Sequence, residues 1–427
     1  MTQKTIFNIQ ELIKTKQTSK KHTKEEINYF IENLNSFTQD EITQWLQAVK
    51  KNSLDDIETS NLTLAMAKSG ETLTWEGLEP TIDKHSTGGI GDKVTLLFVP
   101  LIAACGINIP KLSGRALGFT GGTIDKLESI SGFKTNLSLN EIKEQVKQIG
   151  LALCSASTNL APADKKLYAI RDVTDTVDSI PLIASSIMSK KIAGGATNII
   201  LDVKCGSGAF MKSIEDASFL AKTMVTIGKN LNKNVRAVIS DMNEPLGYSI
   251  GNALEVQEVI DILSGKEISD LVELVICLAR EALSLIKPAP TEEKLRSLLL
   301  NGEALEKFEL MIKAQNGSLK TELPKAKYIE VIKSNTNGFI NHIDALSIGE
   351  IVHDLGAGRK IVTDKIDHSV GIILCKKHGD PIRENEALFE IHAKCKEDID
   401  IIRNKLTNTI KIEDKKPNRL TLIHKII

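Results

Sequence analysis

Residues 83–93 read Asp83-Lys84-His85-Ser86-Thr87-Gly88-Gly89-Ile90-Gly91-Asp92-Lys93. This segment places an ammonium, an imidazole and two hydroxyl side chains among three glycines, and an apolar run follows it from Val94. Glycine lets backbone N–H groups come close to a ligand, and the polar side chains add further donors. A helix that begins at Val94 would point its positive end into the same space. The segment therefore predicts an anion-binding loop between a strand and a helix, with a titratable histidine inside it.

A second loop of this kind lies further along the chain. The short segment Ile107-Asn108-Ile109 leads into Lys111-Leu112-Ser113-Gly114-Arg115, and Gly118 and Thr120-Gly121-Gly122-Thr123 follow. The apolar runs at 198–203 and 235–240 also end in glycine or polar loops. Such strands, each followed by a loop and a helix, are typical of α/β sheets that bind ligands at the carboxyl ends of their strands. The two glycine loops could meet on one oxyanion, although glycines often only make turns.

The regions on either side of these loops have different sequence patterns. Apolar residues up to about residue 70 recur with helical spacing, and Thr23 is a candidate helix cap. A further helix is expected to begin at Ser179 and to end at Gly194-Gly195. From about residue 330, β-branched runs such as 371–374 alternate with glycine turns. The fold class we expect is α/β with several domains: a small all-helical domain, a larger α/β domain with a central sheet, and a β-rich C-terminal domain.

The bulk composition excludes several functions. A chain of 427 residues is long enough for two or three domains. Its 54 basic and 55 acidic residues balance, which argues against nucleic acid as a partner. The six cysteines form no C-x-x-C pair, so no metal site is indicated. No run reaches the ~18–20 apolar residues of a membrane span, and no signal peptide is evident. We expect a cytoplasmic protein with no membrane partner.

A third group of polar residues lies between the two halves of the α/β region. It consists of Tyr168, Arg171, Ser186 and Lys190, and the last two are four residues apart on an expected helix, so they share a face. A solvated polar stripe is the simpler interpretation of this group. The chain contains neither a G-x-x-x-x-G-K-[ST] loop nor a complete G-x-G-x-x-G loop, so ATP and NAD are poor candidates.

Together these segments resemble the signature of the pyrimidine nucleoside phosphorylases, a family that includes thymidine phosphorylase. The resemblance is carried by 83–89, 113–115, 120–128, 161–172 and 186–191, and it extends over nearly the whole chain, most loosely at the C-terminus. It implies reversible phosphorolysis of thymidine, deoxyuridine and uridine to the free base and (deoxy)ribose 1-phosphate. Inorganic phosphate would be the co-substrate, no cofactor would be needed, and the chain would form a homodimer.

The resemblance also implies how the chain is divided into domains and which substrate each domain binds. Residues 1–70 plus 160–195 would form a helical base-binding domain, 80–155 plus 196–330 an α/β phosphate-binding domain, and 331–427 a C-terminal α+β domain. The cleft between the first two would close on the substrates. Three alternatives remain: a strict thymidine phosphorylase, a phosphoribosyltransferase of the same architecture, and a non-catalytic nucleoside-binding relative.

The site residues carry over position by position. His85, Arg171, Ser186 and Lys190 would be catalytic, because the leaving pyrimidine gains negative charge that cations and hydrogen-bond donors stabilise. His85 would protonate or hydrogen-bond a base oxygen. The base and sugar would contact Tyr168, Lys111, Arg171, Ser186 and Lys190. Phosphate would be held by Lys84, Ser86, Thr95, Lys111, Ser113 and Thr123.

Some positions differ from the usual pattern of the family. Lys111 stands where thymidine-specific relatives usually have methionine, which favours acceptance of uridine through its 2′-hydroxyl. Ala116, Phe119 and the stretch 156–158 also depart from the pattern. No metal is expected, but a former monovalent-cation site is indicated, in which Lys93 replaces the ion and pairs with Glu258. The other positions that match that site are Gly91, Leu246 and Ser249.

Overall fold

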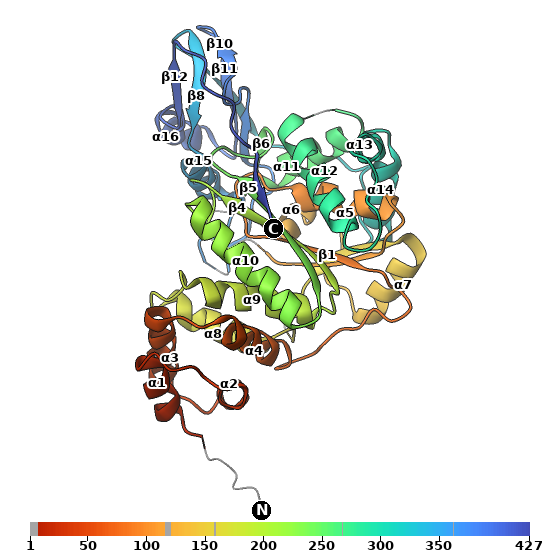
Figure 1. The fold of residues 1–427 in the computed structure, drawn as a ribbon. Helices are drawn as coiled ribbons and strands as arrows, with labels where there is room; N and C mark the ends of the chain where they lie inside the picture. The colour runs from red at the N-terminus through yellow and green to blue at the C-terminus, as the bar shows by residue number, and fades with distance from the viewer. Residues whose placement is uncertain (1–6, 116–120, 158, 267, 362) are drawn as a thin grey trace, which may run out of the picture.

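The computed structural model describes residues 7–115, 121–157, 159–266, 268–361 and 363–427. Its first four helices form one end of the molecule (Figure 1). They are α1 (Ile9–Gln17), α2 (Lys24–Glu32), α3 (Gln39–Asn52) and α4 (Asp56–Ala67). Thr23 caps α2 in a capping box with Glu26, as the sequence predicts, and Asp55 caps α4 in the same way.

Two helices from later in the chain join this group. Helix α8 (Pro162–Asp172) packs on α3 and α4, and α9 (Ile180–Ala193) packs on α4. Ser179 precedes α9 and Gly194 ends it, at the expected positions. The shared core is built from apolar residues of both segments, among them Phe30, Trp45, Leu62, Leu167 and Leu182. The helices are therefore one packed unit although their sequences lie far apart.

The central sheet has the strand order β1-β4-β5-β13. Strands β1 (Ile82–Ser86), β4 (Asn198–Cys205) and β5 (Asn234–Asp241) are parallel, and β13 (Ile423–Ile426) is antiparallel to β5. Strands β2 (Ile109–Ser113) and β3 (Leu151–Ser155) form a separate parallel pair. Helix α10 (Ile214–Asn230) packs on β4 and β5 and also contacts α9.

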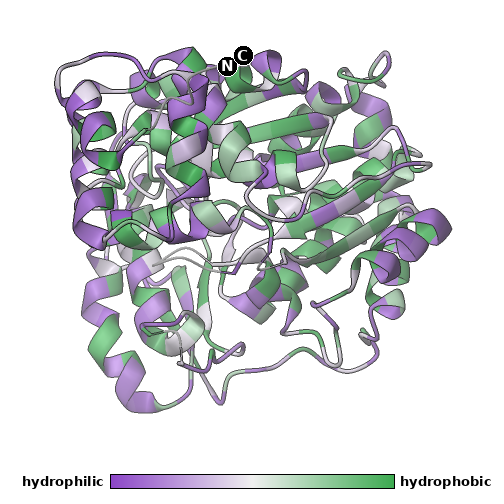
Figure 2. Cartoon of the chain, turned by 90° about the horizontal axis from the view of Figure 1, so that it is seen from below, coloured by the Kyte–Doolittle hydropathy of each residue, from purple (hydrophilic) through white to green (hydrophobic). Residues whose placement is uncertain are grey.

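Helix α5 (Val94–Ala104) begins at Val94, where the sequence predicts it. Its run of apolar residues is buried on all sides because α12 (Ser269–Leu283), α13 (Glu292–Leu300) and α14 (Glu303–Ala314) surround it. The remaining helices of this part are α6 (Thr123–Leu127), α7 (Leu139–Ile149) and α11 (Asn252–Leu263). Most helices of the molecule carry both hydrophilic and hydrophobic residues (Figure 2).

The C-terminal part contains two further sheets, β10-β8-β12 and β6-β9-β11-β7. Their strands are β6 (Ser249–Ile250), β7 (Tyr328–Lys333), β8 (Gly338–Ile343), β9 (Gly371–Leu374), β10 (Pro381–Ile382), β11 (Ala387–Ala393) and β12 (Ile410–Glu413). Helix α15 (Ala345–Val352), a π-helix at His353–Ala357 and α16 (Lys396–Thr407) complete it.

The expected fold class is confirmed: helices at one end, a central sheet with its helices, and a β-rich C-terminal part at the other end (Figure 1). Two strands cross between the parts. Strand β6 lies in the α/β segment but pairs with β9, and β13 returns from the C-terminus to pair with β5. The exact domain boundaries stay a prediction. Within the described ranges, no helix combines the length and apolarity needed to cross a bilayer.

Candidate active site

The carboxyl end of β1 and the start of α5 form the first glycine loop. Lys84 is fully buried, and its Nζ lies 3.3 Å from Thr95 Oγ1 and 3.3 Å from Asp202 Oδ2. Thr95 stands in the first turn of α5, so its hydroxyl and the helix N-terminus face the same loop. These two predicted phosphate ligands are therefore in direct contact.

Three residues that sequence reasoning missed support this loop. Asp202 and Lys204 of β4 are fully buried and form an ion pair of 2.8 Å, and Ser240 donates a hydrogen bond to Asp202. Asp202 therefore lies between two lysines, Lys84 and Lys204, at 3.3 and 2.8 Å. The sequence did contain a signal for this ion pair. Asp202 and Lys204 are two residues apart in a mostly apolar strand, so they share one face of the sheet and can pair there when the strand is buried.

Ser86 already has a carboxylate partner. Its hydroxyl donates to Asp92 Oδ2 at 2.5 Å, and Lys126 Nζ donates to the backbone carbonyl of Asp92 at 2.7 Å. Burial would raise the pKa of Asp92, but the positive charges of Lys204, Lys84 and Lys126 hold that pKa well below its usual value. The free loop thus contains an internal anion beside a predicted phosphate ligand.

Lys111, in the middle of β2, is buried beside Asp83. Its Nζ donates to the carbonyl of Leu112 at 2.6 Å and lies 3.3 Å from Asp83 Oδ1, while Lys191 Nζ lies 2.8 Å from Asp83 Oδ2. Burial lowers the pKa of Lys111 to about 7, although Asp83 opposes this. Two of the three ammonium donors of Lys111 thus face Leu112 and Asp83. The ion pair between Asp83 of β1 and Lys191 therefore connects β1 to the last turn of α9.

His85 lies among four lysines. Burial is the main cause that lowers the pKa of His85 well below its usual value, and the charges of Lys191, Lys111, Lys190 and Lys84 add to it. The imidazole is therefore neutral at pH 7. Among the described residues, its Nε2 is a buried atom with no hydrogen-bond partner. A neutral ring can donate a hydrogen bond to a base oxygen, which favours that alternative over protonation.

Two of the predicted base-binding residues, Ser186 and Lys190, are in contact on α9. Lys190 Nζ lies 3.1 Å from Ser186 Oγ, so these two residues share a face as expected. Lys190 also forms an ion pair with Asp164, a buried residue of α8 that sequence reasoning missed. The Lys190 side chain keeps 43% of its exposure, so its charge still faces solvent.

Arg171 is bound to backbone carbonyls of the segment that follows it. Its guanidinium donates to the carbonyls of Thr176, Val177 and Leu182, at 3.2, 2.8 and 3.2 Å, and it lies 5.9 Å from the ring centre of Tyr168. Burial lowers the pKa of Arg171. A guanidinium has five N–H donors, so two remain for a ligand.

The second glycine loop is only partly described. Ser113 ends β2 and Thr123 begins α6, which places both at element ends beside the loop. Residues 116–120 and 158 lie outside the described residues, and with them the departures at Ala116, Phe119 and Thr158 and the motif positions Gly118 and Thr120.

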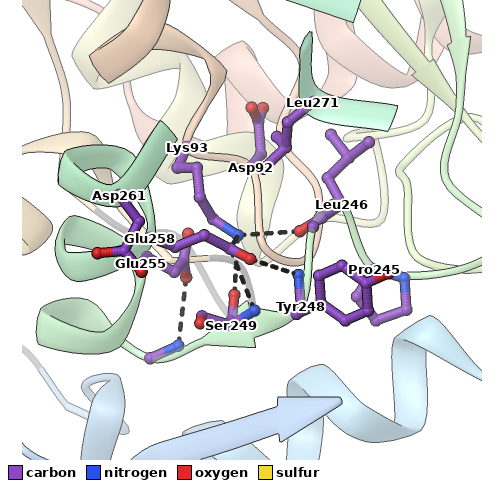
Figure 3. Close-up of polar contacts among 12 residues, drawn as sticks. Asp92, Lys93, Pro245, Leu246, Tyr248, Ser249, Glu255, Glu258, Asp261 and Leu271 are labelled. Carbon is purple, nitrogen blue, oxygen red and sulfur yellow. Dashed lines mark hydrogen bonds and ion pairs between the residues drawn. The ribbon is translucent and has the colours of Figure 1, made fainter. Parts of the chain in front are cut away.

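The Lys93 side chain is fully buried beneath the first loop (Figure 3). Its Nζ donates to the carbonyls of Leu246 and Ser249, both at 2.9 Å, and lies 2.6 Å from Glu258 Oε2. Gly91 adjoins this cluster at a φ of +68°, and a Cβ there would lie 2.5 Å from the Leu246 carbonyl oxygen. Two carbonyls and one carboxylate around a monovalent charge are the kind of oxygen set that also suits an alkali ion.

The chain is similar in sequence to known proteins. A family model described as "Glycosyl transferase family, a/b domain" matches residues 78–305, and one described as "Pyrimidine nucleoside phosphorylase C-terminal domain" matches 339–413. Proteins named pyrimidine-nucleoside phosphorylase from Staphylococcus haemolyticus and Staphylococcus epidermidis are each 46% identical over 432 residues. Each alignment covers 98% of this chain and 99% of the relative.

A solved structure is similar in fold. Anthranilate phosphoribosyltransferase from Thermus thermophilus aligns with a TM-score of 0.58 and 17% identity, over 71% of this chain and 99% of that chain. At that identity the likeness concerns the fold alone. The nearly full-length relatives and the C-terminal match are more specific, and on these grounds the chain belongs to the pyrimidine-nucleoside phosphorylase family.

Proposed function

We propose that this protein catalyses the reversible phosphorolysis of pyrimidine nucleosides, with inorganic phosphate as co-substrate. The observation that carries the proposal is the position of His85. Within the described part of the chain its Nε2 has no hydrogen-bond partner, and the charges of Lys84, in the first glycine loop, and of Lys190, beside Ser186, both lower the pKa of the ring. One titratable group would therefore connect the proposed phosphate residues with the proposed base residues. We also propose that the active form is a homodimer, as the resemblance implies.

The residues divide the chemistry between them. As the glycosidic bond breaks, the sugar gains oxocarbenium character and the pyrimidine ring gains negative charge. Lys190 and the free N–H groups of Arg171 would stabilise that charge, with neutral His85 donating to a ring oxygen. Lys84, Thr95 and Ser86 would hold phosphate close to the anomeric carbon. Ser86 has one hydrogen to donate, so it would exchange Asp92 for a phosphate oxygen.

Release of free base tests this proposal. The purified protein is incubated with thymidine, deoxyuridine, uridine or cytidine, with and without phosphate, and the bases and sugar phosphates are separated by chromatography. We expect uracil and thymine only when phosphate is present, together with the pentose 1-phosphate. Binding without turnover would support a non-catalytic relative. Turnover of thymidine and deoxyuridine without uridine would support a strict thymidine phosphorylase.

Lys111 is proposed to set the acceptance of uridine. Its pKa of about 7 means that the ammonium is lost as the pH rises through neutrality. The ratio of kcat/KM for uridine to kcat/KM for thymidine is therefore expected to fall by about tenfold from acid to alkaline pH, because one charge-assisted hydrogen bond to the 2′-hydroxyl is lost. Titration of the phosphate co-substrate affects both nucleosides equally, so it does not change this ratio of kcat/KM values. In Lys111→Met the ratio should be low and independent of pH, and equal losses for both nucleosides would contradict this role.

We propose that the Lys93 ammonium takes the place of a monovalent cation, so the wild-type protein should not need potassium. Lys93→Thr removes the charge and leaves Glu258 with the two carbonyls. Loss of one partner of a buried ion pair typically costs about 3–5 kcal/mol. We therefore expect a lower midpoint of thermal unfolding and lower activity, both restored in part by KCl and not by choline chloride. Steep potassium dependence of the wild-type protein would argue against the replacement.

A further inference from the structure

The loop Glu244–Ser249 between β5 and α11 is bonded on two sides. On one side, Lys93 and Glu258 of the α/β part bind it: Lys93 donates to the carbonyls of Leu246 and Ser249, and Glu258 accepts from the N–H groups of Tyr248 and Ser249 at 2.8 and 3.1 Å (Figure 3). Gly247 within the loop has a φ of +64°, and a Cβ there would lie 3.0 Å from Lys93 Nζ.

On the other side, a buried lysine of the C-terminal part binds two further carbonyls of the loop. Lys377, in the connection between β9 and β10, donates to the carbonyls of Pro245 and of Gly247, the latter at 3.1 Å. Its Nζ also lies 3.0 Å from Asp270 Oδ2 and 3.3 Å from Glu244 Oε1. Asp270 in turn accepts from the Gly247 N–H at 2.9 Å. Two ammonium groups from different parts of the chain thus hold alternate carbonyls of one loop.

The same loop supports the first glycine loop. The Leu246 N–H donates to the Ile90 carbonyl at 3.1 Å, and Gly91 lies so close to the Leu246 carbonyl that no side chain would fit. Residues 90 and 91 stand between Ser86 and the start of α5. A shift of the loop would therefore move the backbone that arranges Ser86, Asp92 and Thr95.

We propose that Lys377 is a positioning residue for phosphate, acting from the C-terminal part through the loop Glu244–Ser249 on the first glycine loop. This inference rests on the proposed function, in which that glycine loop binds phosphate. It assigns a specific task to the C-terminal part: the β9–β10 connection sets the geometry of the phosphate loop, although no residue of that connection belongs to the proposed phosphate ligands. The base residues on α8 and α9 are not part of this chain of contacts.

The test compares Lys377→Met with Lys376→Met in the full-length protein. Lys376 is the adjacent lysine, and it pairs with the partly exposed Glu386 at 3.1 Å, a contact of small energetic value. In Lys377→Met we expect the KM for phosphate to rise about 10- to 100-fold, the cost of a small misplacement of binding groups. The KM for thymidine and kcat at saturating phosphate should stay within about threefold. Lys376→Met should behave like the wild type.

A readout that needs no turnover separates this inference from the proposed function. Hydrogen exchange of the unliganded protein should be faster in Lys377→Met at residues 88–93 and 244–249, with the helices α8 and α9 unchanged. Lys377→Arg should restore slow exchange and part of the phosphate affinity. If Lys377→Met does not fold, Asp270→Asn can be used instead, because it weakens the same ion pair. It should raise the KM for phosphate and speed up exchange at the same residues, but by smaller factors. Equal rises in the KM of both substrates, or unchanged exchange at residues 88–93, would overturn the inference.

Discussion

Replacing Lys190 with methionine is expected to lower kcat for thymidine phosphorolysis by about 10²–10³-fold, the usual cost of removing one group that stabilises charge in the transition state. Lys190 is held by Asp164 and lies 3.1 Å from Ser186 Oγ, so its ammonium is fixed in position before substrate binds. Since the charge on the base develops only as the bond breaks, kcat and kcat/KM should fall together. Steady-state rates at saturating phosphate measure this effect.

A matched control is available on the neighbouring helix. Lys165 of α8 is exposed, and Lys165→Met should leave the rate unchanged. The loss in Lys190→Met should also be smaller for 5-fluorodeoxyuridine, whose base leaves more readily as an anion and needs less stabilisation. If Lys190→Met instead raised the KM for thymidine and left kcat intact, the ammonium would only bind the nucleoside.

Lys84→Met is expected to weaken phosphate binding by about 10²-fold, because a buried ammonium is lost from the centre of the phosphate loop. Calorimetric titration with phosphate measures the affinity directly, and steady-state kinetics should show the same rise in the KM for phosphate. The fold should survive, because Asp202 keeps Lys204 at 2.8 Å and the Ser240 hydroxyl at 2.7 Å. Unchanged phosphate affinity would mean that Lys84 serves only to neutralise Asp202.

Much of the fold could be predicted because it depends on local patterns. The start of α5 at Val94, the cap of α2 at Thr23 and the strands around 198–203 and 235–240 are read from neighbouring residues, and the structure has them there. The shared face of Ser186 and Lys190 follows from helical periodicity alone. These features need no knowledge of distant segments.

The partners of the buried charges were harder to predict. Asp202, Lys204 and Asp164 escaped attention because charged residues of a strand or helix are usually solvated. Only the packing of β1 on β4, and of α8 on α9, removes water from these groups and gives each a counter-charge. The pKa of His85 is a similar case, because burial and the charges of lysines from three different elements lower it.

Sequence by itself determined the elements, the glycine loops and the polar groups that each element presents, because helical and strand periodicity decide which residues share a face. Tertiary structure decided which charges became buried, which of them are neutral, and that Lys93 and Lys377 hold opposite sides of one loop. The reason is physical: the energy of a charge depends on its distance from water and from other charges, and those distances exist only once remote segments have packed together.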